Sequence, residues 1–237
     1  MNLNAFLSRN GVCSRRKAAV LIKEGKVTVN GKKVIEPWHE VKEGDVVKAE
    51  GRAVGQKRHA YLVINKPKGV TSTAEDRFAA KKVTDLVPPK FGRVYPVGRL
   101  DRESRGLMIL TSDGDLCYSL THPKFEIEKE YLVTIKGMAD EKLAKDLKKG
   151  VMDEEELLKV RSAHVEKASE DRSSVRVVIC EGKKRHLRRL FSRLGMEVID
   201  LVRVRIAGLR LGDLRDGKFR VMDRKEILAL LGIKKPQ

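Results

Sequence analysis

The residues best suited to chemistry gather in one short stretch, from Gly98 to Leu107. Three arginines, Arg99, Arg102 and Arg105, surround the carboxylate of Asp101, and glycines bound the stretch before an apolar strand begins. Nearby cations favour the ionised form of such a carboxylate. By residue type alone, Asp101 fits a nucleophile, a general base or the anchor of a salt-bridged turn.

Several other chemistries are excluded by the motifs they require. The chain has no glycine-rich phosphate loop ending in Gly-Lys-Ser/Thr, no dinucleotide fingerprint and no nucleophile elbow around a serine. Its histidines and cysteines show no metal-ligand spacing and no disulfide framework. We therefore expect neither a metal nor a cofactor. The residues concerned are His39, His59, His122, His164, His186, Cys13, Cys117 and Cys180.

The charge points to a polyanionic partner. Lys and Arg number 51 against 33 Asp and Glu, which gives a net charge of +18 and a pI near 9.9. An excess of this size, spread along the chain, favours nucleic acid as the partner. The alternative is a highly charged surface that serves only solubility. No apolar run approaches the roughly 20 residues that span a bilayer, and the first residues lack a secretory signal.

The elements that must position these residues fall into two blocks. In the first, residues 1–55, we expect helices over 4–10 and from Arg15 to Lys23, with Ser14 as an N-cap. Asn30-Gly31 predicts a hairpin turn, and a further short strand is expected at Val46-Val47. A polar linker, 51–57, is expected to end this small domain.

Cations at the start of the second helix suggest a role for the first block. Arg15, Arg16 and Lys17 occupy its first turn and Arg9 precedes it. Cations in a first turn oppose the helix macrodipole and cost stability, so we expect them to contact phosphate. A solvated basic face is the alternative.

For the second block, residues 58–237, we predict a catalytic body of the α+β class. Many strands, few βαβ alternations and several hairpin turns predict a mixed, mostly antiparallel sheet flanked by helices. Strands are expected near 61–64, 107–110, 130–135, 159–166, 174–180 and 198–211, and helices near 115–120, 140–149, 183–194 and 224–231.

The motifs together carry a resemblance to a known family. The Gly98–Leu107 stretch resembles the catalytic motif of RsuA/RluB-type ribosomal pseudouridine synthases, and four further motifs follow the family's order and spacing. The first block resembles the alpha-L RNA-binding domain that this family carries at its N-terminus. The further motifs are Asn65–Gly69, Tyr95–Val97, Lys129–Val133 and Glu181–Arg189.

The resemblance implies a role for several residues. Asp101 would be the essential carboxylate, Arg99 would help displace the target nucleotide, and Tyr131 would stack on the flipped uracil and assist deprotonation. Arg188 would pair with Asp101. Leu187 would line the pocket. Lys66 and Pro67 would shape its edge. We therefore expect Asp101 and Arg188 within ion-pair reach, with Tyr131 facing the same cavity.

The implied reaction is the cofactor-free isomerisation of a uridine to pseudouridine. It breaks the N1–C1′ bond and rejoins the base through C5, after attack of the carboxylate on C1′ or after removal of a sugar proton. The expected partner is ribosomal RNA or an immature ribosomal subunit, with a slight preference for the large subunit. We expect a cytoplasmic monomer with no membrane association. The alternative is a non-catalytic RNA-binding ribosome-assembly factor with a synthase-like body.

Three departures from the family pattern are visible. Ser104 stands where threonine is usual, and His186 stands where glutamine is usual. The loop Asp76–Lys82 lacks the usual glycine-arginine pair and is expected to recognise RNA differently.

Overall fold

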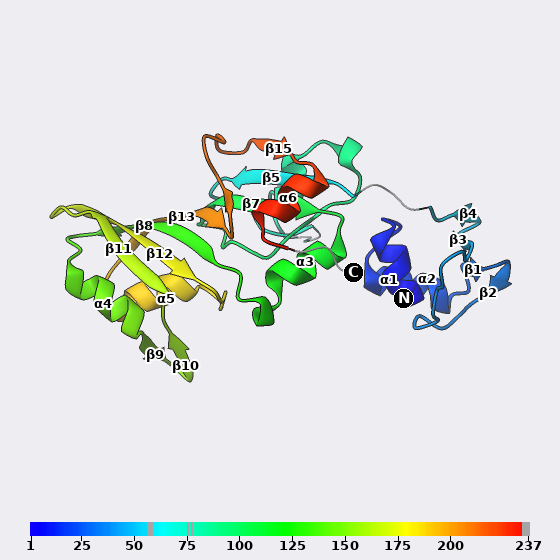
Figure 1. Cartoon of the computed structure of the whole chain (residues 1–237), viewed down its shortest axis with the longest axis horizontal. Coiled ribbons are helices and arrows are strands. Elements are labelled where there is room, and N and C mark those ends of the chain that lie inside the picture. The colour runs from blue at the N-terminus through cyan, green and yellow to red at the C-terminus, as the bar shows by residue number, and fades with distance from the viewer. Residues whose placement is uncertain (56–58, 75, 77, 234–237) are drawn as a thin grey trace. The chain divides into compact units, whose positions relative to one another are not determined.

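The computed structural model describes residues 1–55, 59–74, 76 and 78–233 (Figure 1). The chain divides into two compact units. The front unit comprises Met1–Ala60 with the short segments Pro89–Arg93 and Ser112–Gly114, and the body comprises Tyr61–Pro88, Val94–Thr111 and the chain from Asp115 onward. Within the described residues, no helix has the length and apolar character needed to cross a bilayer.

Two short helices and a small sheet make up the front unit, as expected. Ser14 caps the second helix by accepting a hydrogen bond from the backbone N–H of Lys17 at 3.2 Å. Asn30 and Gly31 both have positive φ, 51° and 79°, as the expected two-residue hairpin turn requires. The elements are α1 (Leu3–Arg9), α2 (Arg15–Lys23), β1 (Val27–Val29), β2 (Lys32–Lys33), β3 (Val47–Ala49) and β4 (Arg52–Ala53), and the sheet order is β2-β1-β3-β4.

The expected linker at 51–57 begins instead with a strand. Arg52 and Ala53 form β4, which pairs antiparallel with β3. Glu50 and Gly51 connect the two strands with positive φ, so the glycine serves a hairpin turn. Residues 56 and 57 lie outside the described residues.

The body is built on one large mixed sheet, as predicted. Its strand order is β11-β12-β8-β13-β7-β5-β15, with β14 paired to β13 and β6 to β7. The pair β13–β7 is parallel, and the other neighbours along this order are antiparallel. The strands are β5 (Tyr61–Lys66), β6 (Tyr95–Pro96), β7 (Arg105–Thr111), β8 (Lys129–Lys136), β11 (Ser162–Lys167), β12 (Arg172–Ile179), β13 (Val198–Ile206), β14 (Leu209–Arg210) and β15 (Phe219–Val221).

Helices flank this sheet (Figure 1). Side chains of α3 and α6 join those of β5 and β7 in one buried cluster that includes Val63, Ile109, Leu116 and Ile227. Asp140 and Asp223 cap α4 and α6 through their carboxylates, as their positions predicted. The remaining elements are α3 (Gly114–Thr121), α4 (Glu141–Lys149), α5 (His186–Arg193), α6 (Arg224–Leu230), the 3-10 helices η1 (Val83–Leu86), η2 (Pro89–Phe91) and η3 (Pro123–Phe125), and the hairpin β9 (Val151–Asp153) and β10 (Glu156–Leu158).

The basic helix α5 begins later than its composition predicted. It starts at His186 rather than at Lys183, because Arg185 adopts a left-handed backbone with φ 52° and becomes the N-cap. Lys183 and Lys184 therefore lie in the loop before the helix, and Arg185 is its N-cap.

The second glycine of the Gly98–Leu107 stretch lies inside β7 and allows a close approach between strands. A Cβ at Gly106 would lie 2.4 Å from the carbonyl oxygen of Arg203 and 2.7 Å from its nitrogen, both in β13. Gly106 also has φ +109°, which disfavours side chains. The parallel pairing of β7 with β13 therefore requires a glycine at this position. The Asp101 loop leads directly into β7.

We predict that Gly106→Ala destabilises the body strongly. Overpacking against backbone and a positive φ together should lower the free energy of unfolding by at least about 3 kcal/mol, measured by urea denaturation. Gly137→Ala is the matched control, because Gly137 has φ +82° but a Cβ added there would meet nothing within 4 Å. It should cost about 1 kcal/mol. Equal losses in the two variants would contradict the close-approach argument.

Candidate active site

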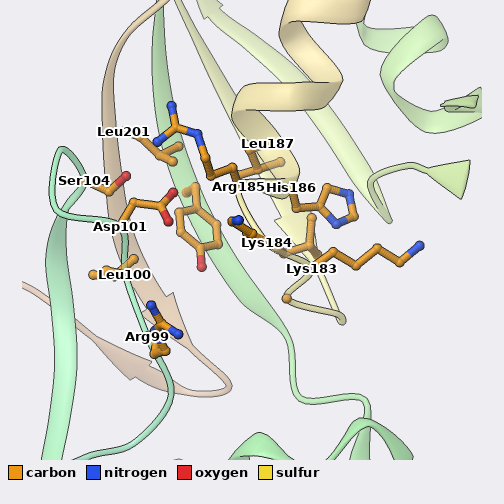
Figure 2. Close-up of a pocket in the computed structure, with 13 residues that line it drawn as sticks. Arg99, Leu100, Asp101, Ser104, Lys183, Lys184, Arg185, His186, Leu187 and Leu201 are labelled. Atoms are coloured by element: carbon orange, nitrogen blue, oxygen red, sulfur yellow. The ribbon is translucent and has the colours of Figure 1, made fainter. Parts of the chain in front are cut away.

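The body contains a cavity of about 570 Å³ at the Asp101 loop. Figure 2 shows Asp101 on one side of this cavity and the segment from Lys183 to Leu187 on the other. Among its lining residues, all of which the structure describes, Asp101 is the sole acid. The lining consists of Arg99, Leu100, Asp101, Ser104, Tyr131, Ile179, Gly182, Lys183, Lys184, Arg185, His186, Leu187 and Leu201.

Hydrogen bonds hold the loop on both sides of Asp101. The Ser72 hydroxyl donates to the carbonyl of Leu100 at 2.6 Å and accepts from the Leu100 N–H at 3.0 Å. The backbone N–H of Gly69 donates to the carbonyl of Arg102 at 2.8 Å. Because these bonds engage the residues before and after Asp101, they fix the backbone that presents its carboxylate.

Two arginines attach the loop to α5 through Glu103. Arg185 forms an ion pair with the Glu103 carboxylate at 3.3 Å, and Arg188 donates to the Glu103 carbonyl at 3.3 Å. A backbone hydrogen bond within Glu103 and the bond from Arg185 lower the pKa of this carboxyl group, although partial burial opposes them. The loop is therefore braced from the helix side immediately after Asp101.

The expected ion pair between Asp101 and Arg188 is not formed. The Arg188 guanidinium donates to the carbonyls of Val198 and Glu103, and Arg188 is not among the residues that line the cavity. The first carbonyl belongs to the first residue of β13 and the second to the loop that contains Asp101. Arg188 therefore contacts the backbone of the loop two residues after Asp101.

Asp101 and Tyr131 line the same cavity, as the geometric expectation required. Tyr131 is only 6% exposed, and Asp101 is half-buried. Within the described part of the chain, no hydrogen bond or ion pair engages the Asp101 carboxylate. The carboxylate is therefore available to a ligand that enters between the two side chains.

The other expected pocket residues divide into two groups. Arg99 and Leu187 line the cavity, Arg99 exposed and Leu187 buried. Lys66 and Pro67 do not line it, because the Lys66 ammonium turns inward and donates to the carbonyls of Pro67 and Val70. Burial lowers the pKa of Lys66 to about 8, opposed by the nearby carboxylate of Glu103.

The basic residues of the front unit lie at the surface. Arg15, Arg16 and Lys17 are exposed in the first turn of α2, and Arg9, the last residue of α1, is half-buried. Their exposure leaves the three cations of α2 accessible to a phosphate backbone. Their role in RNA contact stays a prediction.

Arg203 is a site residue that the motifs did not single out. It is 2% exposed, its Nε donates to the carbonyl of Leu107 at 2.7 Å, and its Nη1 lies 3.5 Å from the Tyr131 hydroxyl. Arg203 and Tyr131 are paired positions of β13 and β8. The available signal was the alternation of β13, which places an arginine on the same side as Leu201.

His186 occupies the position where glutamine is usual and is buried in the cavity wall. Its Nε2 lies 3.0 Å from the carbonyl of Lys159 and must donate to it, so Nδ1 is the acceptor in the neutral ring. Burial lowers the pKa of His186 below 6.5, and the carboxylate of Glu181, 3.8 Å from Nδ1, only partly opposes this. The folded protein therefore favours neutral His186.

We predict that acidification destabilises the wild type more than His186→Gln. A lowered folded pKa gives a stabilising contribution that is present above the unfolded value near 6.5 and is lost as the pH falls. The free energy of unfolding should therefore fall more for the wild type than for His186→Gln between pH 7.5 and pH 5.5. The glutamine amide can still donate to the Lys159 carbonyl. Parallel pH dependences would show that His186 does not resist protonation.

The described residues contain no group of three or more His, Cys, Asp or Glu side chains that could hold a metal ion. The site is instead one acid and one aromatic ring enclosed by cations, with apolar side chains such as Leu187 and Leu201 between them. Such a cavity suits a ligand that is planar in one part and anionic in another.

Comparison with known families divides the chain in two. Residues 60–193 match RNA pseudouridylate synthase, and residues 1–47 match the S4 domain. The first match covers more than half of the chain.

Individual relatives resemble the chain over nearly its whole length. The chain is 39% identical over 232 residues to a protein of Bacillus subtilis named ribosomal large subunit pseudouridine synthase B, covering 96% of this chain and 94% of the relative. It is 34% identical to the dual-specificity RNA pseudouridine synthase RluF of Escherichia coli, covering 97% of this chain and 78% of the relative. A crystal structure of a pseudouridylate synthase, 28% identical, superposes with a TM-score of 0.68 over 97% of this chain and 99% of that one.

Proposed function

The chain belongs to the RNA pseudouridylate synthase family, and from this premise we propose that it converts a specific uridine of ribosomal RNA to pseudouridine, with large-subunit RNA favoured as substrate. The observation that carries the proposal is the shared cavity of Asp101 and Tyr131, with its rim of cations. The name of the Bacillus subtilis relative supports the choice of the large subunit.

The cavity can hold a uridine only after the base has left its helix. Extrusion of a base costs a few kcal/mol, and stacking on an aromatic side chain returns about 1–3 kcal/mol. Tyr131 provides the stacking surface, and the exposed Arg99 at the mouth fills the space that the base vacates. Lys184 and Arg185 meet the phosphates of the extruded nucleotide.

In this proposal Asp101 is the reacting carboxylate. It either attacks C1′ and displaces the uracil, or removes a sugar proton to release it. The freed uracil turns between Tyr131 and the leucines, and C5 bonds to C1′. On the first route the bond between Asp101 and C1′ breaks in this step, and on the second Asp101 returns the proton to the sugar. The C5 proton is then lost while N1 gains one. The reaction is an isomerisation, so atoms balance without a second substrate.

The front unit captures the RNA. Its exposed cations Arg15, Arg16 and Lys17, with Arg9 nearby, neutralise phosphates of a structured segment beside the target. The protein acts as a cytoplasmic monomer on ribosomal RNA or an immature subunit.

The test maps pseudouridine on defined RNA. Purified wild type and Asp101→Asn are incubated with deproteinised rRNA and with immature ribosomal subunits, and pseudouridine is located by carbodiimide-blocked primer extension. A new stop made by the wild type and absent with Asp101→Asn is expected. Equal RNA binding by both proteins, with no stop on any rRNA form, would instead identify a non-catalytic assembly factor.

A further inference from the structure

A second cavity, of about 520 Å³, adjoins the one that contains Asp101. The two cavities share four lining residues, Arg99, Tyr131, Gly182 and Lys183. A strand of RNA whose target base lies against Tyr131 therefore passes the mouth of the second cavity with its neighbouring nucleotides. The described residues that form it all belong to the body.

The second cavity contains a buried hydrogen-bond donor without a partner. Arg203 lines it, and while Nε and Nη1 have acceptors, Nη2 has none among the described residues and is fully buried. An unsatisfied buried N–H costs about 1–3 kcal/mol, more when the group is charged. Because Nη2 has no exposed surface, an acceptor on a ligand reaches it only when the surrounding side chains move, and its arrival then removes this cost.

A second cation, Lys129, also offers hydrogen-bond donors in this cavity. Lys129 lines the same cavity and donates to the carbonyl of Ile127 at 2.9 Å. Burial, and then the charge of Arg203, lower the pKa of Lys129 to about 8. Arg203 and Lys129 thus offer donors and positive charge in a cavity whose one acidic lining residue, among those the structure describes, is Glu181.

The walls of the cavity are apolar and its rim is aromatic. Val97, Leu120 and Ile206 line it and are buried. The rim is formed by His122, which lines the cavity, and by Tyr118 and Phe125, which lie beside it outside the lining. The rings of His122 and Tyr118 have centroids 4.9 Å apart, and those of Tyr118 and Phe125 lie 5.8 Å apart. An anionic group alone would be poorly matched to these walls, whereas a flat ring is well matched.

The rim also has the composition of a base-stacking surface. Tyr118 and Phe125 remain 49% and 41% exposed, and the Lys124 ammonium lies 4.8 Å from the Phe125 ring centroid and 5.2 Å from that of Tyr118. Exposed aromatic rings combined with a cation bind single-stranded nucleic acid through stacking.

From these observations we infer that the second cavity binds a nucleobase of the substrate RNA adjacent to the target uridine. The base enters over the rings of Tyr118 and Phe125, lies between the apolar walls and accepts a hydrogen bond from Nη2 of Arg203. The inference rests on the proposed function and adds a second extruded or unpaired nucleotide to the recognised RNA. Because the side chains of Arg203 and Lys129 offer donors, the bases with an exocyclic carbonyl (guanine, uracil and cytosine) are preferred over adenine.

Photochemical cross-linking tests this inference independently of turnover. Asp101→Asn is bound to a large-subunit rRNA transcript that contains scattered 4-thiouridine or 6-thioguanosine, whose sulfur joins the base directly to contacting side chains. After irradiation and trypsin digestion, adducts are expected in peptides 106–124 or 125–129, which contain Tyr118 and Phe125. Adducts confined to other peptides would overturn the inference.

A binding measurement supplies the second readout. In the same background, Tyr118→Ala with Phe125→Ala is expected to raise the Kd for the transcript about tenfold. Met138→Ala, which removes an exposed apolar side chain that belongs neither to the rim nor to the lining of either cavity, serves as the control and should leave Kd unchanged. Equal affinities for the double variant and the control would overturn the inference. Adducts at the rim in a protein whose wild type never makes pseudouridine would sustain it while refuting the proposed function.

Discussion

Replacing Asp101 by asparagine is expected to lower the single-turnover rate of pseudouridine formation by more than about 10³-fold while RNA affinity stays within about twofold. The amide is nearly isosteric, so the cavity keeps its shape, but it can neither attack C1′ nor take a proton from the sugar. The rate is measured by release of tritium from C5-labelled uridine in the RNA, and affinity by filter binding.

The control for this variant is Asp171→Asn, which makes the same change of charge at an exposed position outside both cavities. It should leave rate and affinity unchanged. If Asp101→Asn retained more than about a tenth of the rate, Asp101 would be a structural residue of its loop and another group would react.

Replacing Arg188 by methionine is expected to lower kcat about 10²-fold with little change in KM. The side chain length is similar, but the loop loses the bond to the Glu103 carbonyl and α5 loses the bond to Val198. A misplacement of the Asp101 carboxylate by about 1 Å can cost 10²-fold. Steady-state kinetics on the mapped RNA measure both constants.

Arg172→Met, at an exposed position at the start of β12, is the control for loss of one positive charge. Arg188→Lys separates the two roles that an arginine here can have. A lysine keeps the charge but cannot reach two carbonyls with a rigid fork, so it should be nearly as slow as methionine. Recovery of most of the rate by lysine would show that the charge of Arg188 matters, as an ion pair with Asp101 in the RNA complex requires.

Much of the fold could be predicted because its signals are local. The side chains of Ser14, Asp140 and Asp223 cap helices through bonds to residues close by in sequence. The alternation of β8 likewise lies within one strand. The start of α5 could not be predicted, because the left-handed backbone of Arg185 accompanies an ion pair with the distant Glu103.

The site was predictable to the extent that it lies in sequence motifs. Asp101 and Tyr131 were identified by their place in family patterns, and they share a cavity. The predicted ion-pair partner of Arg188, Asp101, was wrong. Backbone carbonyls compete for a guanidinium, and no sequence pattern indicates where they lie. Arg203 was missed because its bond to Tyr131 spans 72 positions of the chain.

The position of β13 in the sheet has a consequence for folding during synthesis. This strand lies between β7 and β8, yet it follows both in the chain. At synthesis rates of about 5–20 residues per second, roughly 4 to 14 s separate the end of β8 from the end of β13. During that interval β7 and β8 each present an open hydrogen-bonding edge, and open edges invite pairing with other chains. We therefore expect chaperones to protect the nascent protein against aggregation most in this interval. The cavity that contains Asp101 cannot form before β13, which carries its lining residue Leu201, has left the ribosome.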